Sequence, residues 1–474
     1  MSGKGNTAQC SSGYKAIVFL VCIIAALGGL LFGLDQGFIA NSLPTIEKVY
    51  HIGITGGESY SAILAVGAAI GALLSGFFAR YLGRKRTLVF AGFMFVVMSA
   101  ISAMLPPFYI LSACRFALGF AVGVSSFIVP LYLSETAPSS IRGAMGTLFQ
   151  LMITAGIFLI SLANVIIVKV FVDPTASLPM MFTVIVIFGA IMFIGAMFLP
   201  QSPRWLMLKN RKDKALKVLH KTLNTEQEIQ LEIKEIEEAI GGSKGSVAGV
   251  IFKKYFLKIL VVGIFIQIFQ MLVGINLMVY YAPTIFGYAG MHGILAKMSI
   301  PTVFLVFTFP AIWLVEKWGR KKLLYIGSII MGITMASAGF AFLAIGNVND
   351  PSLISPVIKG VLLISAVIYT IGFAFTWGPC AWLMCSEIFP IEGREVGMTI
   401  TTMVNWSLGA VIMGTSLSFM HIFGNYSIFF LFAVCCFLSI LFLKLFVPET
   451  KGISLEKMEF NLKKGIRLKN IGSY

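Results

Sequence analysis

Charged residues are scarce in this sequence: they make up 12% of its 474 positions, whereas 58% are hydrophobic. Soluble globular domains do not have that balance, so we expect an integral membrane protein. Acidic residues are fewer than basic ones, 20 against 36. In a soluble chain the net charge of +16 would suggest nucleic acid, but here the basic residues gather in particular loops. We therefore expect no nucleic-acid partner.

Cysteine is also sparse, and its seven positions lack the spacing of metal ligands. The sequence likewise shows no grouping of nucleophile, base and oxyanion donors. These absences argue against an enzyme and against a metal site, and no cofactor is expected.

Long apolar runs are what the chain has instead. Twelve runs reach about 20 residues, the length that crosses a bilayer. We predict an all-α integral membrane protein with twelve transmembrane helices in two pseudo-symmetric six-helix bundles. The predicted divisions are an N-terminal tail (1–14), a first bundle (15–199), a linker with short helices (200–255), a second bundle (256–447) and a C-terminal tail (448–474).

Basic residues follow the even-numbered runs, as in GRKR after the second and GRKK after the eighth. The positive-inside rule then predicts a multi-pass protein of the cell inner membrane with both termini in the cytoplasm. The first run is too long for a cleaved signal peptide and is predicted to be retained.

The two halves of the chain repeat one another. GRKRTL after the second run matches GRKKLL after the eighth, and SETAPSSIR after the fourth matches SEIFPIEGR after the tenth. PQSPRWL after the sixth run corresponds to PETKG after the twelfth. Such a duplication favours two related bundles with a solute site between them, one rocking against the other.

The repeated loops carry glutamate and arginine at equal offsets. We predict that these charges form ion pairs between the bundles when the cytoplasmic side is closed. Exposed pairs contribute only about 0 to 1 kcal/mol each, which suits a gate that opens in every cycle. The alternative is that they merely solvate helix ends. The predicted gate residues are Arg84, Glu135, Arg142, Arg204, Glu316, Arg320, Glu387 and Arg394.

Asp35 is the only charge within the first run, GGLLFGLDQGFIA. A carboxylate at that depth is costly, and its default interpretation is a proton or ion site with a partner. Arg115, at the start of the fourth span, is the candidate partner. Protonation of Asp35 would release Arg115 and could tie proton binding to the direction in which the cavity faces. A static structural ion pair is the alternative.

The stretch FQMLVGINLMVYYAP in the seventh run places Gln270, Asn276 and Tyr281 at bilayer depth. Polar groups there usually face a protein interior or a wet cavity. Gly274 and Pro283 loosen the helix around them. We therefore predict a broken helix that lines a solute site.

Aromatic and amide side chains recur in other spans as well. Aromatic rings offer an apolar face to the C–H side of a sugar, and amides both donate to and accept from hydroxyls. Without a cationic clamp, the set favours an uncharged polyhydroxylated solute, although any single ring could serve packing instead. The candidate binding residues are Phe32, Gln150, Gln270, Asn276, Tyr281, Trp382, Asn405 and Trp406.

Over nearly its whole length the chain resembles the sugar porter family of the major facilitator superfamily, in particular bacterial galactose and xylose proton symporters. The motifs are GRKR, PLYLSETAPSSIRG, PQSPRWL, WGRKK, WGPCAWLMCSEIFPIEGR and PETKG. The resemblance implies twelve helices, short cytoplasmic helices and alternating access. It adds Gly378 to the binding residues. It also implies that Asp35 takes up the proton, the coupling ion, with Arg115 as partner.

The chain departs from that family at several positions. Met271 stands where a second glutamine is usual, and Phe304 where an asparagine is expected. Arg80 and Gln201 replace acidic residues near the predicted gate. The first two changes leave the choice among hexoses, pentoses and polyols open.

The sequence thus predicts a monomeric proton-coupled symporter that imports a neutral monosaccharide, a hexose first, across the lipid bilayer. A facilitative uniporter of a sugar or of a polyol such as inositol is the alternative. A sugar sensor that does not transport and a drug exporter are less favoured.

Overall fold

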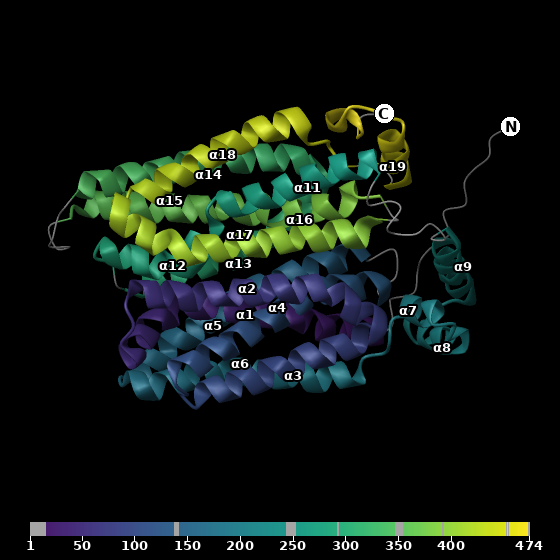
Figure 1. Ribbon diagram of the computed structural model, residues 1–474, viewed down its shortest axis with the longest axis horizontal. Helices are drawn as coiled ribbons and strands as arrows, with labels where there is room; N and C mark the ends of the chain where they lie inside the picture. Colours follow the sequence, from purple (N-terminus) through teal and green to yellow (C-terminus); the bar gives the residue numbers. More distant parts are fainter. Residues whose placement is uncertain are drawn as a thin grey trace.

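The computed structural model describes residues 16–136, 142–242, 253–291, 293–346, 354–390, 393–451, 453 and 455–472. In these ranges the secondary structure is helical, and 12 segments are long and apolar enough to cross a membrane. The predicted fold class is therefore confirmed. Figure 1 shows two layers of helices, the N-terminal half below and the C-terminal half above.

The first six spans are single helices that form one bundle. They are α1 (Ala16–Tyr50), α2 (Ile54–Tyr81), α3 (Arg84–Ala103), α4 (Phe108–Thr136), α5 (Arg142–Val170) and α6 (Pro174–Phe198). The helix α1 continues past Pro44 to Tyr50. The start of α6 is fixed locally, because the Asp173 carboxylate accepts from the Thr175 backbone N–H at 3.0 Å and Pro174 occupies the first turn.

Three short helices follow: α7 (Pro203–Leu208), α8 (Lys212–Thr222) and α9 (Glu226–Gly242). They lie at the same end of the bundles as the C-terminal helix α19 (Leu455–Lys463) (Figure 1). We call this end the termini face and the other end the opposite face.

Two spans of the second bundle are each divided into two helices. The elements are α11 (Lys254–Leu272), α12 (Ile275–Tyr288), α13 (Ile294–Trp318), α14 (Arg320–Ile345), α15 (Pro356–Phe375), α16 (Trp377–Ile388), α17 (Arg394–Phe423) and α18 (Ser427–Phe446). The chain ends with α19 (Leu455–Lys463) and the short 3₁₀ helix η3 (Leu468–Asn470). The broken seventh span that the sequence predicted is present between α11 and α12.

Small residues bring α2 and α4 into close backbone contact in the first bundle. On α2, a Cβ added at Gly67 or Gly71 would lie 2.1 or 2.2 Å from a carbonyl oxygen of α4. On α4, a Cβ at Gly119 or Gly123 would lie 2.0 or 2.1 Å from a carbonyl of α2. Apolar lipid gives helices little reason to associate, so backbone approach at such residues is a main source of contact.

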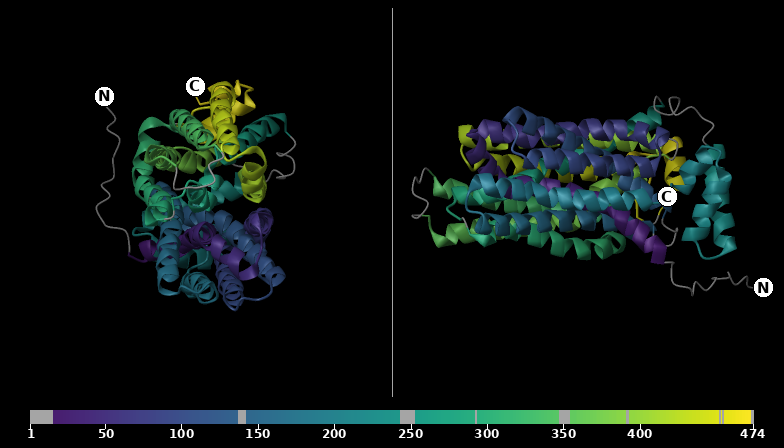
Figure 2. Two further views of the ribbon diagram at one scale, coloured as in Figure 1. Left: turned by 90° about the vertical axis from the view of Figure 1, so that its left-hand side faces the viewer. Right: turned by 90° about the horizontal axis from the view of Figure 1, so that it is seen from below.

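Contacts between the bundles come from a few helices. The helix α2 packs on α17, α5 on α13, and α1 on α12. Figure 2 shows the two bundles as separate groups when the molecule is viewed along the helices. Any solute site between the bundles is therefore bordered by these helices.

Candidate functional site

The break in the seventh span centres on Gly274, whose φ of +97° is accessible to glycine and strained for other residues. The break brings Asn276 back toward the preceding helix, where its Nδ2 donates to Met271 Sδ at 3.3 Å. Both side chains are buried. Met271 thus takes part in the amide arrangement of this segment.

Three buried amides form a connected cluster. Asn405 on α17 donates from Nδ2 to Gln270 Oε1 at 2.5 Å and to Gln267 Oε1 at 2.7 Å. The Gln267 amide in turn donates to Cys385 Sγ at 3.5 Å. Sequence reasoning missed Gln267, although its spacing of three residues from Gln270 places both on one helix face.

Tyr281 is fully buried, and its hydroxyl donates to the Met413 backbone oxygen of α17 at 2.5 Å. This bond ties α12 to α17 within the second bundle. In this structure the hydroxyl is therefore committed to the protein.

Two rings meet across the bundles. The centroids of Phe32 on α1 and Trp406 on α17 lie 5.3 Å apart. The buried Trp406 Nε1 has no hydrogen-bond partner among the described residues. A buried donor without a partner is uncommon, and it points to a ligand or water contact. Gln150 lies half-buried on α5, one residue after Phe149, whose ring is 6.5 Å from that of Phe32.

The remaining predicted binding residues lie on α16. This helix begins after Thr376, which has an irregular conformation of φ −124° and ψ −89°. Gly378 is buried in its first turn, and Trp382 is half-buried one turn later. Within the described part of the chain, Trp382 makes no hydrogen bond or ring contact. The structure thus joins Gln270 and Asn405, pairs Phe32 with Trp406, and leaves Trp382 outside these contacts.

The pair predicted from sequence between Asp35 and Arg115 is present. Arg115 Nη1 lies 2.6 Å from Asp35 Oδ1, and both side chains are fully buried. The guanidinium also lies 5.7 Å from the Phe38 ring centroid and 5.5 Å from that of Tyr60. The second carboxylate oxygen, Oδ2, has no partner among the described residues.

The gate residues form ion pairs within each bundle. Arg84 contacts Glu135 through two bonds, of 2.6 and 2.8 Å, and Arg320 Nη2 lies 2.8 Å from Glu387 Oε1. These pairs differ from the expected pairing between the bundles, because each arginine reaches the glutamate of its own repeat. Pairing between the bundles stays a prediction for the state in which the termini face is closed.

The other four predicted gate residues lie apart from these two pairs. Arg394 begins α17, and Arg204 lies in α7 without an ion pair to a described residue. The side chains of Arg142 and Glu316 lie outside the described residues.

Glu58, which sequence reasoning missed, connects the bundles near the opposite face. This fully buried residue of α2 accepts from the backbone N–H groups of Leu417 at 2.6 Å and Ser418 at 3.0 Å. It also accepts from the Ser418 hydroxyl. All three donors belong to α17 in the second bundle. In the sequence Glu58 lies at the edge of an apolar run, where charged residues are common, so no signal distinguished it.

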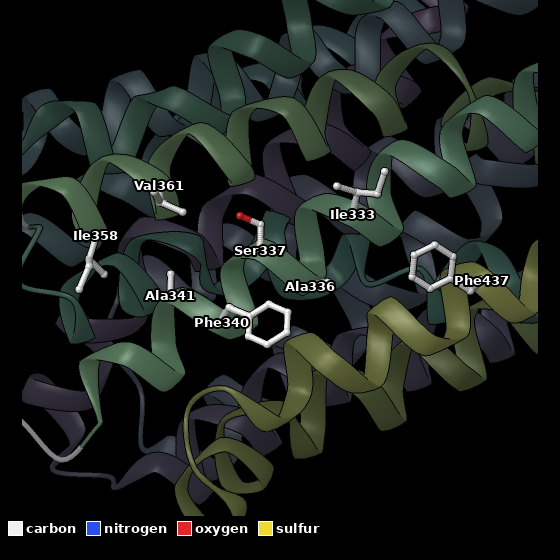
Figure 3. Close-up of a pocket in the computed structure, with 8 residues that line it drawn as sticks. All are labelled: Ile333, Ala336, Ser337, Phe340, Ala341, Ile358, Val361 and Phe437. Atoms are coloured by element: carbon white, nitrogen blue, oxygen red, sulfur yellow. The ribbon is translucent and has the colours of Figure 1, made fainter.

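A separate apolar cavity of about 570 Å³ lies between α14, α15 and α18 (Figure 3). Its lining residues include Phe340 and Phe437, which are largely exposed on the outside of the bundle. None of the predicted binding residues lines it. This cavity is a feature of the outer surface, away from the amide cluster.

Comparison with known proteins agrees with this architecture. The model of the family described as "Sugar (and other) transporter" matches residues 21–462. The galactose-proton symporter of Escherichia coli (strain K12) is 37% identical over 466 residues, 97% of either chain. The arabinose-proton symporter of the same strain is 34% identical over 458 residues, 95% of either chain.

Solved structures agree as well. The inward-open conformation of the xylose transporter of E. coli has a TM-score of 0.78 and 29% identity, covering 94% of this chain and 99% of that one. The fold, the buried polar groups and these relatives define a membrane transporter, and the choice of transporter over enzyme is confirmed. The chain belongs to the sugar transporter family of the major facilitator superfamily.

Proposed function

We propose that this chain is a proton-coupled symporter that imports a neutral monosaccharide by alternating access. The observation that carries the proposal is the fully buried ion pair of Asp35 and Arg115. A carboxylate at this depth is costly and needs a function or a strong partner. The galactose-proton and arabinose-proton symporters named above support the same assignment. Galactose, glucose and similar hexoses are the first substrates to test.

The pair can couple a proton to a change of shape. When Asp35 is ionised, it neutralises Arg115 in a fully buried site. A proton on Asp35 removes that neutralisation and leaves the guanidinium with the Asp35 backbone carbonyl, 3.3 Å from Nη2, and the Phe38 and Tyr60 rings. Leaving one member of a buried pair uncompensated costs about 3 to 5 kcal/mol. A cost of that size favours a conformation in which Arg115 finds other partners.

The amide cluster and the paired rings are proposed to hold the sugar. Gln270 and Asn405 now bond to each other, so each can exchange that bond for one to a sugar hydroxyl. The unpartnered Trp406 Nε1 supplies a further donor. We include Gln150, Asn276, Tyr281, Gly378 and Trp382 in the proposed site on the family resemblance.

The membrane arrangement follows from the charge pattern. We propose that the termini face is cytoplasmic, as the basic loops predict. Inter-bundle contacts by Glu58 near the opposite face, together with ion pairs confined to single bundles at the termini face, support a conformation open toward the termini face.

The first prediction tests proton coupling through Asp35→Asn. Inward movement of one charge through 100 mV contributes about 2.3 kcal/mol, a gradient of roughly fifty-fold when coupling is tight. The variant should lose uphill sugar accumulation in vesicles while keeping sugar exchange without a gradient. Asp213→Asn, an exposed residue of α8, is the matched control. Wild-type accumulation by the Asp35 variant would show that this carboxylate does not carry the proton.

A facilitative uniporter is the second candidate. It would apply if Asp35 only holds Arg115 in place and takes up no proton. Measuring external pH on sugar addition separates the two functions. A symporter alkalinises the medium around de-energised cells, whereas a uniporter leaves the pH unchanged.

A further inference from the structure

A second, polar cavity lies at the termini face, outside the proposed sugar site. Its volume is about 500 Å³, and it is bounded by the ends of α2 and α3 and by the linker helices α7 and α8. Its polar and aromatic lining residues are Tyr81, Arg86, Gln201, Trp205, Lys209, Arg211 and Lys214. Four of these are cations and none is acidic.

No acidic residue in the described part of the chain pairs with these four cations. Among the described residues, Arg86, Lys209, Arg211 and Lys214 make no ion pair. The neighbouring Lys212, in contrast, lies 2.7 Å from Glu237. Like charges around one cavity repel one another, so an anion bound there would be favoured.

The walls of the cavity are held in place before any ligand binds. Trp205 is only 6% exposed, and its Nε1 donates to the Arg80 carbonyl at 3.1 Å. Lys209 Nζ lies 5.8 Å from the Tyr81 ring centroid and 5.9 Å from that of Trp205, a cation–π arrangement. The cavity therefore combines a fixed aromatic wall with several cationic side chains.

The position of the cavity indicates the source of the anion. Tyr81 is the last residue of the α2 span and is 59% exposed. Phe77, one turn earlier, is 58% exposed, and the two rings lie 4.4 Å apart. This exposed aromatic surface continues from the cavity along the membrane-facing side of α2. A ligand that carries both a phosphate and an acyl chain would match both regions.

We propose that this cavity binds the phosphate headgroup of an anionic phospholipid, with its acyl chain along Phe77 and Tyr81. Basic clusters at the membrane surface attract anionic headgroups, and the contribution falls off within a Debye length. The lipid would join the first bundle to the linker helices, because Arg86 belongs to α3, Lys209 and Arg211 lie in the turn between α7 and α8, and Lys214 belongs to α8.

The test compares lipid retention by the full-length purified protein. The second prediction is that native mass spectrometry shows at least tenfold preferential retention of phosphatidylglycerol over phosphatidylcholine. Arg86→Gln, Lys209→Gln, Arg211→Gln and Lys214→Gln combined should remove that preference. The matched control neutralises four exposed lysines outside the cavity, Lys217, Lys221, Lys254 and Lys258, and should keep it.

Two outcomes would overturn the proposal. One is equal retention of phosphatidylglycerol by the cavity variant and the control. The other is binding of inorganic phosphate that depends on the same four residues, without any preference between lipids, which would assign the cavity to a soluble anion. Melting of each variant in phosphatidylcholine checks that it is folded, and the milder pair Arg211→Gln and Lys214→Gln repeats the comparison if the full set is not.

Discussion

The Met271 thioether accepts a hydrogen bond from the Asn276 amide, which would otherwise be free to donate to a sugar hydroxyl. Sulfur is a weak acceptor, so the 3.3 Å contact from Asn276 Nδ2 is readily exchanged for a better one. Phe304, the other departure from the family pattern, packs against Phe373 with centroids 5.9 Å apart. The two residues make this part of the site less polar than the family pattern.

The third prediction concerns substrate choice. Met271→Gln should change the ratio of affinities among hexoses, pentoses and inositol by about 2- to 12-fold, because one net hydrogen bond contributes about 0.5 to 1.5 kcal/mol. Counterflow of labelled sugars in proteoliposomes measures the ratio. Met104→Gln, at an exposed position after α3, is the control. An unchanged profile would exclude Met271 from sugar selection.

Single residues were predictable from sequence where a charge lay within an apolar run. Asp35 is the only charge in its apolar run, and Arg115 was the matching cation, so their contact could be anticipated. Gln267 and Glu58 could not be separated from ordinary polar residues, because their importance comes from Asn405 and Ser418, which are distant in sequence. The pairing of each gate arginine within its own bundle also depends on tertiary packing.

At the level of helices, the break at Gly274 was predicted from glycine and proline in one stretch. The break at Thr376 was not predicted, although Gly378 and Pro379 directly follow it and proline cannot donate to the carbonyl four residues earlier. The Thr376 hydroxyl bonds to the Gly372 carbonyl at 2.5 Å, and its Oγ1 lies 1.9 Å from where a Gly327 Cβ would be. Packing against α14 thus accompanies the second break.

The fourth prediction tests the first break. Gly274→Ala should lower stability by about 1 to 3 kcal/mol, because the residue has a positive φ and its Cβ would lie 2.8 Å from Met335 Cε and from the Phe432 ring. Thermal unfolding in detergent measures the loss. Gly76→Ala in α2 is the control, since its Cβ would meet nothing within 4 Å. Equal melting of the two variants would mean that the break is not strained for alanine.

The fifth prediction tests the contact between α2 and α17. Glu58→Ala removes the acceptor for the Leu417 and Ser418 N–H groups, so the opposite face should open more often. Alkylation of a cysteine introduced by Ala62→Cys should then be several-fold faster, since Ala62 lies at the contact with Gly414. Glu395→Ala, an exposed change at the other end of α17, should leave the rate unchanged. A rate unaffected by Glu58→Ala would show that the contact does not hold this face closed.

For the whole molecule, the sequence repeat corresponds to a repeat of contacts. Gly83 and Gly319 have φ of +85° and +87°, and each is followed by the arginine that pairs within its own bundle. The repeat differs in its caps: Glu449 accepts from the Arg320 and Lys321 N–H groups, whereas Gln201 accepts from the Lys85 N–H at 3.4 Å. The two repeats therefore cap these helix starts in the same way, with a charged side chain at Glu449 and a neutral one at Gln201.

The contact of α2 with α4 has a consequence for how the sequence can change. At Gly67, Gly71, Gly119 and Gly123, any added side chain would collide with the backbone of the facing helix. Such collisions cannot be relieved by a change of rotamer. These positions are expected to accept no single substitution. New sugar preferences are therefore expected to arise through residues that face the cavity, while this helix pair stays unchanged.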